Sequence, residues 1–213
     1  MKNLQPEEVH EAAYLIRGSP KPWGMMAGIG GDFDAALYVG YHAMKGTENG
    51  VLAHTIAGTA VDSIHVNGRE TGEFGLNAAL AGWHGVPSVF IAGDAAVAAE
   101  AKSFVPNINT AVVKWAIGRQ AAKCLHPKKA RALIKETVTE ALGKVEDVEP
   151  FIVDEPVEIV LKYGNSLGGD AGALLPYVER LDGRTIRAVF EDYPKAMRGL
   201  GAAISLGGGA MRR

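Results

Sequence analysis

Two histidines and one carboxylate stand where the ends of predicted elements should meet. His42 directly follows the apolar run Ala36–Tyr41, which is typical of a buried parallel strand. His54 lies twelve residues later in a predicted loop, and Glu73 opens a predicted helix. Open α/β sheets build their sites from such strand ends, loops and helix starts. We therefore expect His42, His54 and Glu73 to form the chemical centre of the protein.

Each of these three residues also has a plain structural alternative. A neutral imidazole at His42 is a good zinc ligand, but a histidine at a strand end can simply bond to the backbone. His54 could act as a general base, or it could be an ordinary loop histidine. Glu73 could bind a metal, or it could only be stabilised by the dipole of its helix. Their spacing is not a short zinc signature such as HExxH, so both readings stay open from these residues alone.

Three further side chains could contact a substrate. Asn77 follows Glu73 by one helical turn and should face the same space. Lys114 and Arg119 flank a predicted strand at residues 109–115. They could bind a substrate carboxylate or be solvated charges.

Composition and charge exclude several classes of protein. A net charge of −2 gives no electrostatic basis for binding nucleic acid or an anionic membrane. The single cysteine, Cys124, excludes an internal disulfide and suits a reducing compartment. We interpret it as a small buried residue in a helical region. No apolar run approaches the roughly 18 residues of a membrane span, and the N-terminus lacks a signal core. We expect a cytoplasmic protein.

The order of predicted elements indicates an α/β fold. Strands alternate with helices as far as residue 142, which predicts a doubly wound, mostly parallel sheet with helices on both faces. The pair Asn67-Gly68 predicts a hairpin within residues 55–70, and Asp94 is the predicted N-cap of the helix at 95–104. The predicted strands of this part are 13–16, 36–41, 86–92 and 109–115, and the predicted helices are 6–12, 73–83, 95–104 and 127–142.

The composition of the sequence changes after Gly143. Residues 144–156 are acidic and contain two prolines, so they predict a linker. We expect domains at 1–143 and 151–213, with the hairpin able to pack on the second. The second domain should be a smaller α+β unit. Its predicted strands are 157–163 and 185–190, followed by a helix at 194–206 and a frayed tail from residue 207.

Several motifs, in their order and spacing, resemble one known family. The chain is similar along essentially its whole length to the zinc-dependent D-aminopeptidases. The motifs are Gly40-Tyr41-His42-Ala43, Ala53-His54-Thr55, Gly72-Glu73-Phe74-Gly75-Leu76-Asn77-Ala78 and Val89-Phe90-Ile91-Ala92-Gly93-Asp94, continued by Thr110 to Lys114, Arg119 to Ala122 and Leu125 to Pro127.

The resemblance implies a metallopeptidase. His42 and Glu73 resemble two ligands of one zinc in a two-metal site, and His54 resembles the catalytic histidine. The implied reaction releases an N-terminal D-amino acid from a small peptide by means of a zinc-activated water. The implied assembly is a ring-shaped homo-oligomer, a decamer in the known case. An oligomer would also cover the tail after Leu206 and the apolar patch around Trp23 and Met25.

The chain departs from the family pattern at its start. The family carries a Ser-x-Asp-x-Glu-Gly motif and then an Asp-x-His motif, and this sequence has neither. The resemblance therefore implies an incomplete second metal site, a ligand set that a separate N-terminal segment could complete, and little hydrolysis by these 213 residues alone. The alternative is a non-catalytic, ring-forming structural or binding relative.

Overall fold

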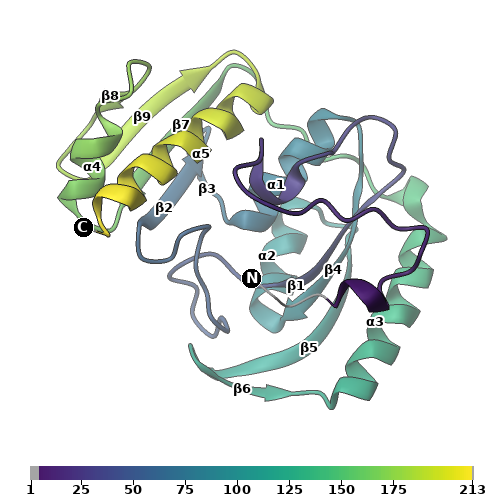
Figure 1. The fold of residues 1–213 in the computed structure, drawn as a ribbon. Helices are drawn as coiled ribbons and strands as arrows, with labels where there is room; N and C mark the ends of the chain where they lie inside the picture. Colours follow the sequence, from purple (N-terminus) through teal and green to yellow (C-terminus); the bar gives the residue numbers. More distant parts are fainter. Residues whose placement is uncertain (1–4, 213) are drawn as a thin grey trace.

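The computed structural model describes residues 5–212, which form two β-sheets on either side of a central helix (Figure 1). The first sheet contains β1 (Ala36–Tyr41), β4 (Ser88–Asp94), β5 (Asn109–Gly118) and β6 (Ala121–Cys124), in the order β1-β4-β5-β6. The strands β1, β4 and β5 run parallel, and β6 returns antiparallel to β5. The predicted mostly parallel sheet is confirmed.

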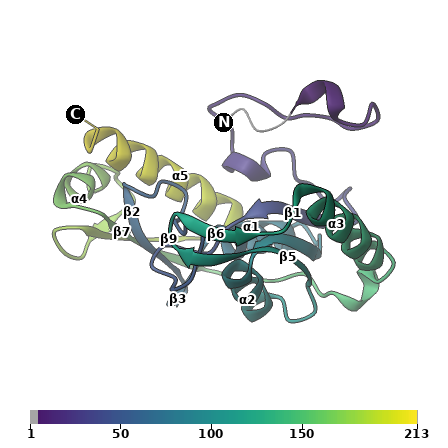
Figure 2. The same cartoon turned by 90° about the horizontal axis from the view of Figure 1, so that it is seen from below.

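Helices cover both faces of this sheet. The helices α1 (Glu73–Trp83) and α2 (Ala95–Phe104) contact each other and the sheet, while α3 (Pro127–Leu142) packs on the opposite face (Figure 2). The predicted cap of α2 is present, because the Asp94 carboxylate accepts a hydrogen bond from the Val97 amide at 2.8 Å. Within residues 5–212, no helix is both long and apolar enough to cross a membrane.

The second sheet is antiparallel and combines strands from distant parts of the chain. The Asn67-Gly68 turn joins its first two strands, with φ of 47° and 81°, as a tight hairpin requires. Helices α4 and α5 pack against this sheet. The elements are β2 (Val61–Val66), β3 (Arg69–Glu70), β7 (Val157–Tyr163), β8 (Glu179–Arg180), β9 (Thr185–Phe190), α4 (Ser166–Gly172) and α5 (Tyr193–Ala210), with strand order β3-β2-β7-β9-β8.

Helix α1 belongs to both cores. Its residues from Glu73 to Gly82 are all buried, as expected of a helix without a polar face. Phe74 and Ala78 pack in the core of the first sheet, whereas Leu76 and Leu80 pack in the core of the second. The division into domains 1–143 and 151–213 stays a prediction. Residues 1–4 of that first domain lie outside the described part of the chain.

Several predicted elements near the N-terminus and around Cys124 are wrong. Residues 6–12 contain only a 3₁₀ turn, η1 (Pro6–Glu8), and residues 13–16 form no strand. Tyr14 is 98% exposed, so this short apolar run does not bury its side chains as a sheet strand would. Cys124 is exposed at the end of β6, because the chain turns back after β5 as a hairpin. Two further 3₁₀ turns are η2 (Gly24–Met26) and η3 (Val145–Asp147).

The predicted frayed tail is also wrong, because α5 continues to Ala210. Gly207 is buried, and a side chain there would overlap the Tyr163 ring. The Tyr163 hydroxyl donates a hydrogen bond to the Ala203 carbonyl at 2.9 Å. Gly207 therefore allows α5 to approach an aromatic ring closely.

Candidate metal centre

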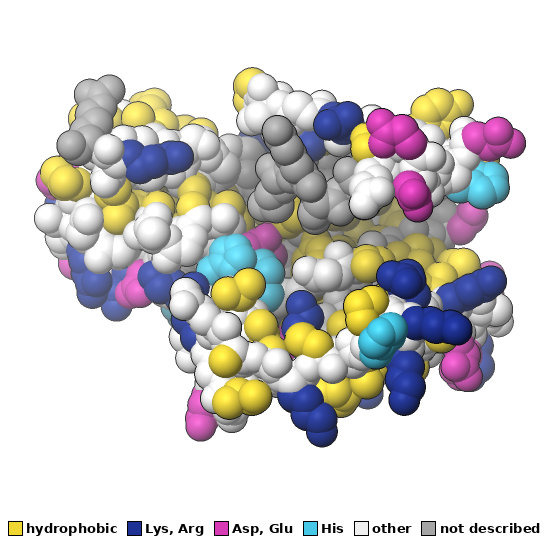
Figure 3. Space-filling model, turned by 60° about the horizontal axis from the view of Figure 1, so that its bottom comes forward, with side chains coloured by type: hydrophobic (Ala, Val, Ile, Leu, Met, Phe, Trp, Pro, Cys, Tyr) yellow, Lys and Arg dark blue, Asp and Glu magenta, His cyan; other side chains and the backbone are white. Residues whose placement is uncertain are grey.

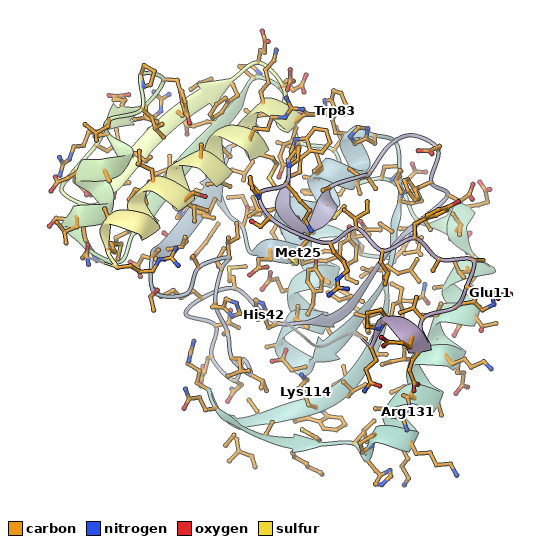
Figure 4. The ribbon with its side chains drawn as sticks, viewed as in Figure 1. Glu11, Met25, His42, Trp83, Lys114 and Arg131 are labelled. Carbon is orange, nitrogen blue, oxygen red and sulfur yellow. The ribbon has the colours of Figure 1, made fainter. Side chains whose placement is uncertain are left out.

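The structure brings His42, His54 and Glu73 together, from the end of β1, the following loop and the start of α1. Figure 4 labels His42 at the end of β1. The His42 Nε2 atom lies 3.5 Å from Glu73 Oε1, and His54 Nε2 lies 3.7 Å from the same oxygen. The two imidazoles stack with their centroids 3.8 Å apart. In the space-filling view, histidine side chains lie beside a carboxylate in a hollow of this face (Figure 3).

The backbone sets which nitrogen each histidine presents. His54 Nδ1 lies 2.7 Å from the Leu52 carbonyl oxygen, and His42 Nδ1 lies 3.2 Å from the Ala43 carbonyl oxygen. A carbonyl only accepts, so Nδ1 carries the proton and Nε2 of the neutral ring keeps its lone pair. Two lone pairs and a carboxylate oxygen then face one another, and a cation is the natural partner for such a set.

The spacing of these donors suits zinc. Zinc–ligand bonds of about 2.0–2.2 Å in a tetrahedral arrangement place two ligands roughly 3.3–3.6 Å apart. The separation of His42 Nε2 and Glu73 Oε1, 3.5 Å, agrees with this spacing. Glu73 is held in place by the Ile56 amide, which donates to its Oε1 at 2.7 Å. The residues present therefore fit a divalent metal.

Two carboxylates on the α2 side anchor the loop between the histidines. The Glu100 Oε2 atom accepts a hydrogen bond from the Met44 amide at 2.7 Å. The Asp94 Oδ2 atom accepts one from the Val51 amide, and both acids are buried. Anchoring at two points of one loop fixes the positions of His42 and His54 before any ligand arrives.

Comparison with known proteins shows the family of this chain. The family model described as D-aminopeptidase, Peptidase_M55, matches residues 1–202. This chain belongs to the D-aminopeptidase family. It is 38% identical over 185 residues to a D-aminopeptidase of Bacillus subtilis (strain 168), a match that covers 87% of this chain and 67% of that protein.

A solved structure of the family has the same fold. It is described as the Zn-dependent D-aminopeptidase DppA from Bacillus subtilis, a self-compartmentalizing protease. It superposes with a TM-score of 0.93 at 35% identity, covering 100% of this chain and 76% of that one. The resemblance inferred from the motifs and the α/β fold class are thereby confirmed.

Two of the three predicted substrate contacts, Asn77 and Lys114, lie outside the three-residue group. The Asn77 side-chain amide donates to the Tyr41 hydroxyl at 2.8 Å, between α1 and β1, and burial raises the pKa of Tyr41 to about 12. Lys114 is half-buried on β5 (Figure 4). Both substrate-binding roles stay predictions.

Sequence reasoning gave little weight to the residues that support the site. The sequence favours Asp94 as a helix cap and gives Glu100 no role in positioning the histidines. The signal for Glu100 was an acid within an alanine-rich helix, residues 95–104. The Ile56 amide gave no signal, because backbone donors carry no residue type.

Glu100 should make the stability of the metal-free protein depend on pH. Burial, followed by the charges of Asp94, Glu73 and Glu70, raises the pKa of Glu100 to about 7 from 4.5 in spite of the hydrogen bond from Met44. A raised carboxyl pKa means that the folded state binds the proton more tightly than the unfolded state. Its contribution to stability is therefore complete below about pH 4.5 and is lost as pH rises to about 7.

Glu100→Gln, which cannot ionise, should avoid that loss. We expect the stability of the variant relative to the parent to rise by about 2–3 kcal/mol between pH 5 and pH 8. Urea unfolding in the presence of a chelator measures it. Glu140→Gln, at an exposed carboxylate paired with Lys144, is the matched control and should show no such rise. A relative stability of Glu100→Gln that stays constant with pH would contradict the prediction.

Proposed function

We propose that this chain is a subunit of a zinc-dependent aminopeptidase that releases N-terminal D-amino acids from small peptides. The observation that supports it most is the convergence of two imidazole Nε2 atoms and one carboxylate, from His42, His54 and Glu73, in a chain that belongs to the D-aminopeptidase family. The alternative, a non-catalytic ring-forming relative, gains no support from a chain that keeps this three-residue group.

The three residues divide into holders of the metal and one that acts on the substrate. His42 Nε2 and the Glu73 carboxylate would hold zinc, which when bound supplies an activated water and polarises the peptide carbonyl. His54 is the more open imidazole, with 31% of its side chain exposed against 21% for His42. Its Nε2 lone pair can take the proton of the attacking water and return it to the leaving amine. The Leu52 carbonyl fixes the tautomer for this task.

Hydrolysis of paired D and L substrates tests the proposal. We expect D-alanyl dipeptides to be cleaved and their L counterparts to be spared. The activity should disappear with a chelator and return with zinc. Equal cleavage of both enantiomers, or activity that survives metal removal, would contradict the proposal. We also predict that a separate N-terminal segment raises the rate at which these 213 residues hydrolyse D-alanyl dipeptides. Adding such a segment to the same assay tests this.

We also propose that the chain assembles into a ring-shaped homo-oligomer, a decamer, in the cytoplasm. Support comes from the relative described as self-compartmentalizing. An oligomer is expected to cover the C-terminal tail and the apolar patch around Trp23 and Met25. The tail is already buried in part along α5, and Trp23 packs on the second core. Met25 remains 58% exposed. Sedimentation equilibrium at micromolar concentration should give a mass well above 22.4 kDa, and a monomer would refute the assembly.

A further inference from the structure

A cavity of about 490 Å³ lies beside the histidine loop. Its volume falls within the usual range for small-molecule sites. The loop that carries both histidines and the turn between β5 and β6 form its wall. The lining residues are Lys45, Gly46, Thr47, Asn49, Gly50, Ala53, Gly58, Gly118 and Arg119.

The cavity directly adjoins His54. Ala53 precedes that histidine, and a side chain at Gly58 would press against the His54 Cβ atom at 3.0 Å. Arg119 makes two hydrogen bonds to the residues just before His54. Its guanidinium Nη2 donates to the Ala53 carbonyl at 3.3 Å, and its own carbonyl accepts from the Leu52 amide at 2.7 Å. Both hydrogen bonds hold Arg119 beside the segment that carries His54.

The charge of the cavity is positive. Lys45 and Arg119 are its charged lining residues, and none of the described residues that line it is an acid. The Lys45 ammonium donates to the Val61 carbonyl at 2.8 Å and lies 3.5 Å from Asp62 Oδ1. Lys162 and Arg184 lie 3.6 and 3.9 Å from the other oxygen of that carboxylate. One carboxylate among three cations leaves net positive charge. The bond to Ala53 uses one of the five N–H donors of Arg119, and the others suit an anion.

We propose that this cavity binds the free C-terminal carboxylate of a short peptide substrate, with Arg119 as the main contact and Lys45 as the second. The inference rests on the proposed function, which places the scissile bond at His42, His54 and Glu73. A di- or tripeptide carries its carboxylate one or two residues, at roughly 3.5 Å each, beyond the scissile bond, and the Arg119 guanidinium is bonded to the residue that precedes His54. The site therefore selects di- and tripeptides with a free carboxylate over amidated or long peptides.

Paired substrates that differ only at this end test the proposal. We expect the parent protein to cleave D-alanyl-glycine with a kcat/KM about 10- to 100-fold above that for D-alanyl-glycinamide, the range of a charged hydrogen bond. In Arg119→Gln the ratio of kcat/KM for the acid to kcat/KM for the amide should fall to about one, mainly because KM for the acid rises. Lys123→Gln, which removes a charge from the same hairpin outside the cavity, should behave as the parent.

Two results would overturn the proposal. One is a parent protein that does not distinguish the acid from the amide. The other is an Arg119→Gln variant that loses the same factor with both substrates, because that pattern would make Arg119 a support of the His54 loop.

A binding measurement separates this proposal from the proposed function. We expect N-acetylglycine to bind the metal-free protein about tenfold or more tightly than N-acetylglycinamide, and Arg119→Gln to remove the difference in an NMR titration. If no D-peptide is cleaved but this selectivity appears, the catalytic proposal fails and the carboxylate site stands. Equal binding of the two compounds would overturn the carboxylate site, whether or not D-peptides are cleaved.

Discussion

His42→Ala and Glu73→Gln are each expected to release zinc from the protein, whereas His54→Ala should retain zinc and lose turnover. His42 and Glu73 present donor atoms 3.5 Å apart, the spacing of two ligands on one zinc. Removing either one leaves the ion with too few protein donors. His54 is the more exposed imidazole, so its loss should remove a proton-transfer group and lower turnover of D-alanyl dipeptides about 10²- to 10⁴-fold.

Zinc content after equilibrium dialysis, measured with turnover on the same samples, distinguishes these roles. His10→Ala is the control, since His10 is exposed and lies outside the three-residue group; it should change neither quantity. Loss of zinc from His54→Ala would make His54 a third ligand, which its 3.7 Å distance from Glu73 Oε1 also permits. Normal zinc content in His42→Ala would remove His42 from the ligand set.

The sequence allowed prediction of the elements whose signals are local. The apolar run before His42, the Asn67-Gly68 turn and the Asp94 cap each fix a conformation with a few neighbouring residues. These elements are present as β1, the β2–β3 hairpin and the start of α2. In an open α/β sheet the C-terminal end of a strand and the start of the following helix lie at the same edge. The convergence of His42, after β1, and Glu73, at the start of α1, therefore also followed from the pattern.

The parts that could not be predicted depend on distant contacts. The pairing of β2 with β7 joins residues about 100 positions apart, and no local pattern specifies that partner. Gly207 suggested a frayed end, although its role is set by the Tyr163 ring. Glu100 supports the site through the Met44 amide, 56 positions away. In each case the residue type carries meaning only once the tertiary neighbour is known.

Gly82→Ala should cause a large loss of stability, because Gly82 lies where the chain crosses α1. A side chain at this buried position would overlap the backbone carbonyl of Phe151. Phe151 packs on both cores, so the segment that carries it cannot move away without disturbing both. Overpacking of this kind typically costs about 1–3 kcal/mol and occasionally more. We expect at least about 3 kcal/mol here, which corresponds to roughly 6–12 °C in the midpoint of thermal unfolding for a chain of this size.

Gly201→Ala is the matched control, and its effect should have the opposite sign. Gly201 is exposed on α5, and an added side chain there would meet no atom within 4 Å. Alanine in a helix is more favourable than glycine by about 0.5–1 kcal/mol, so this variant should unfold slightly later than the parent in calorimetry. If both variants gained stability, the segment at Phe151 would have to move away from α1 at little cost in free energy. In that case α1 would not be the rigid element that joins the two cores and holds Glu73 in place.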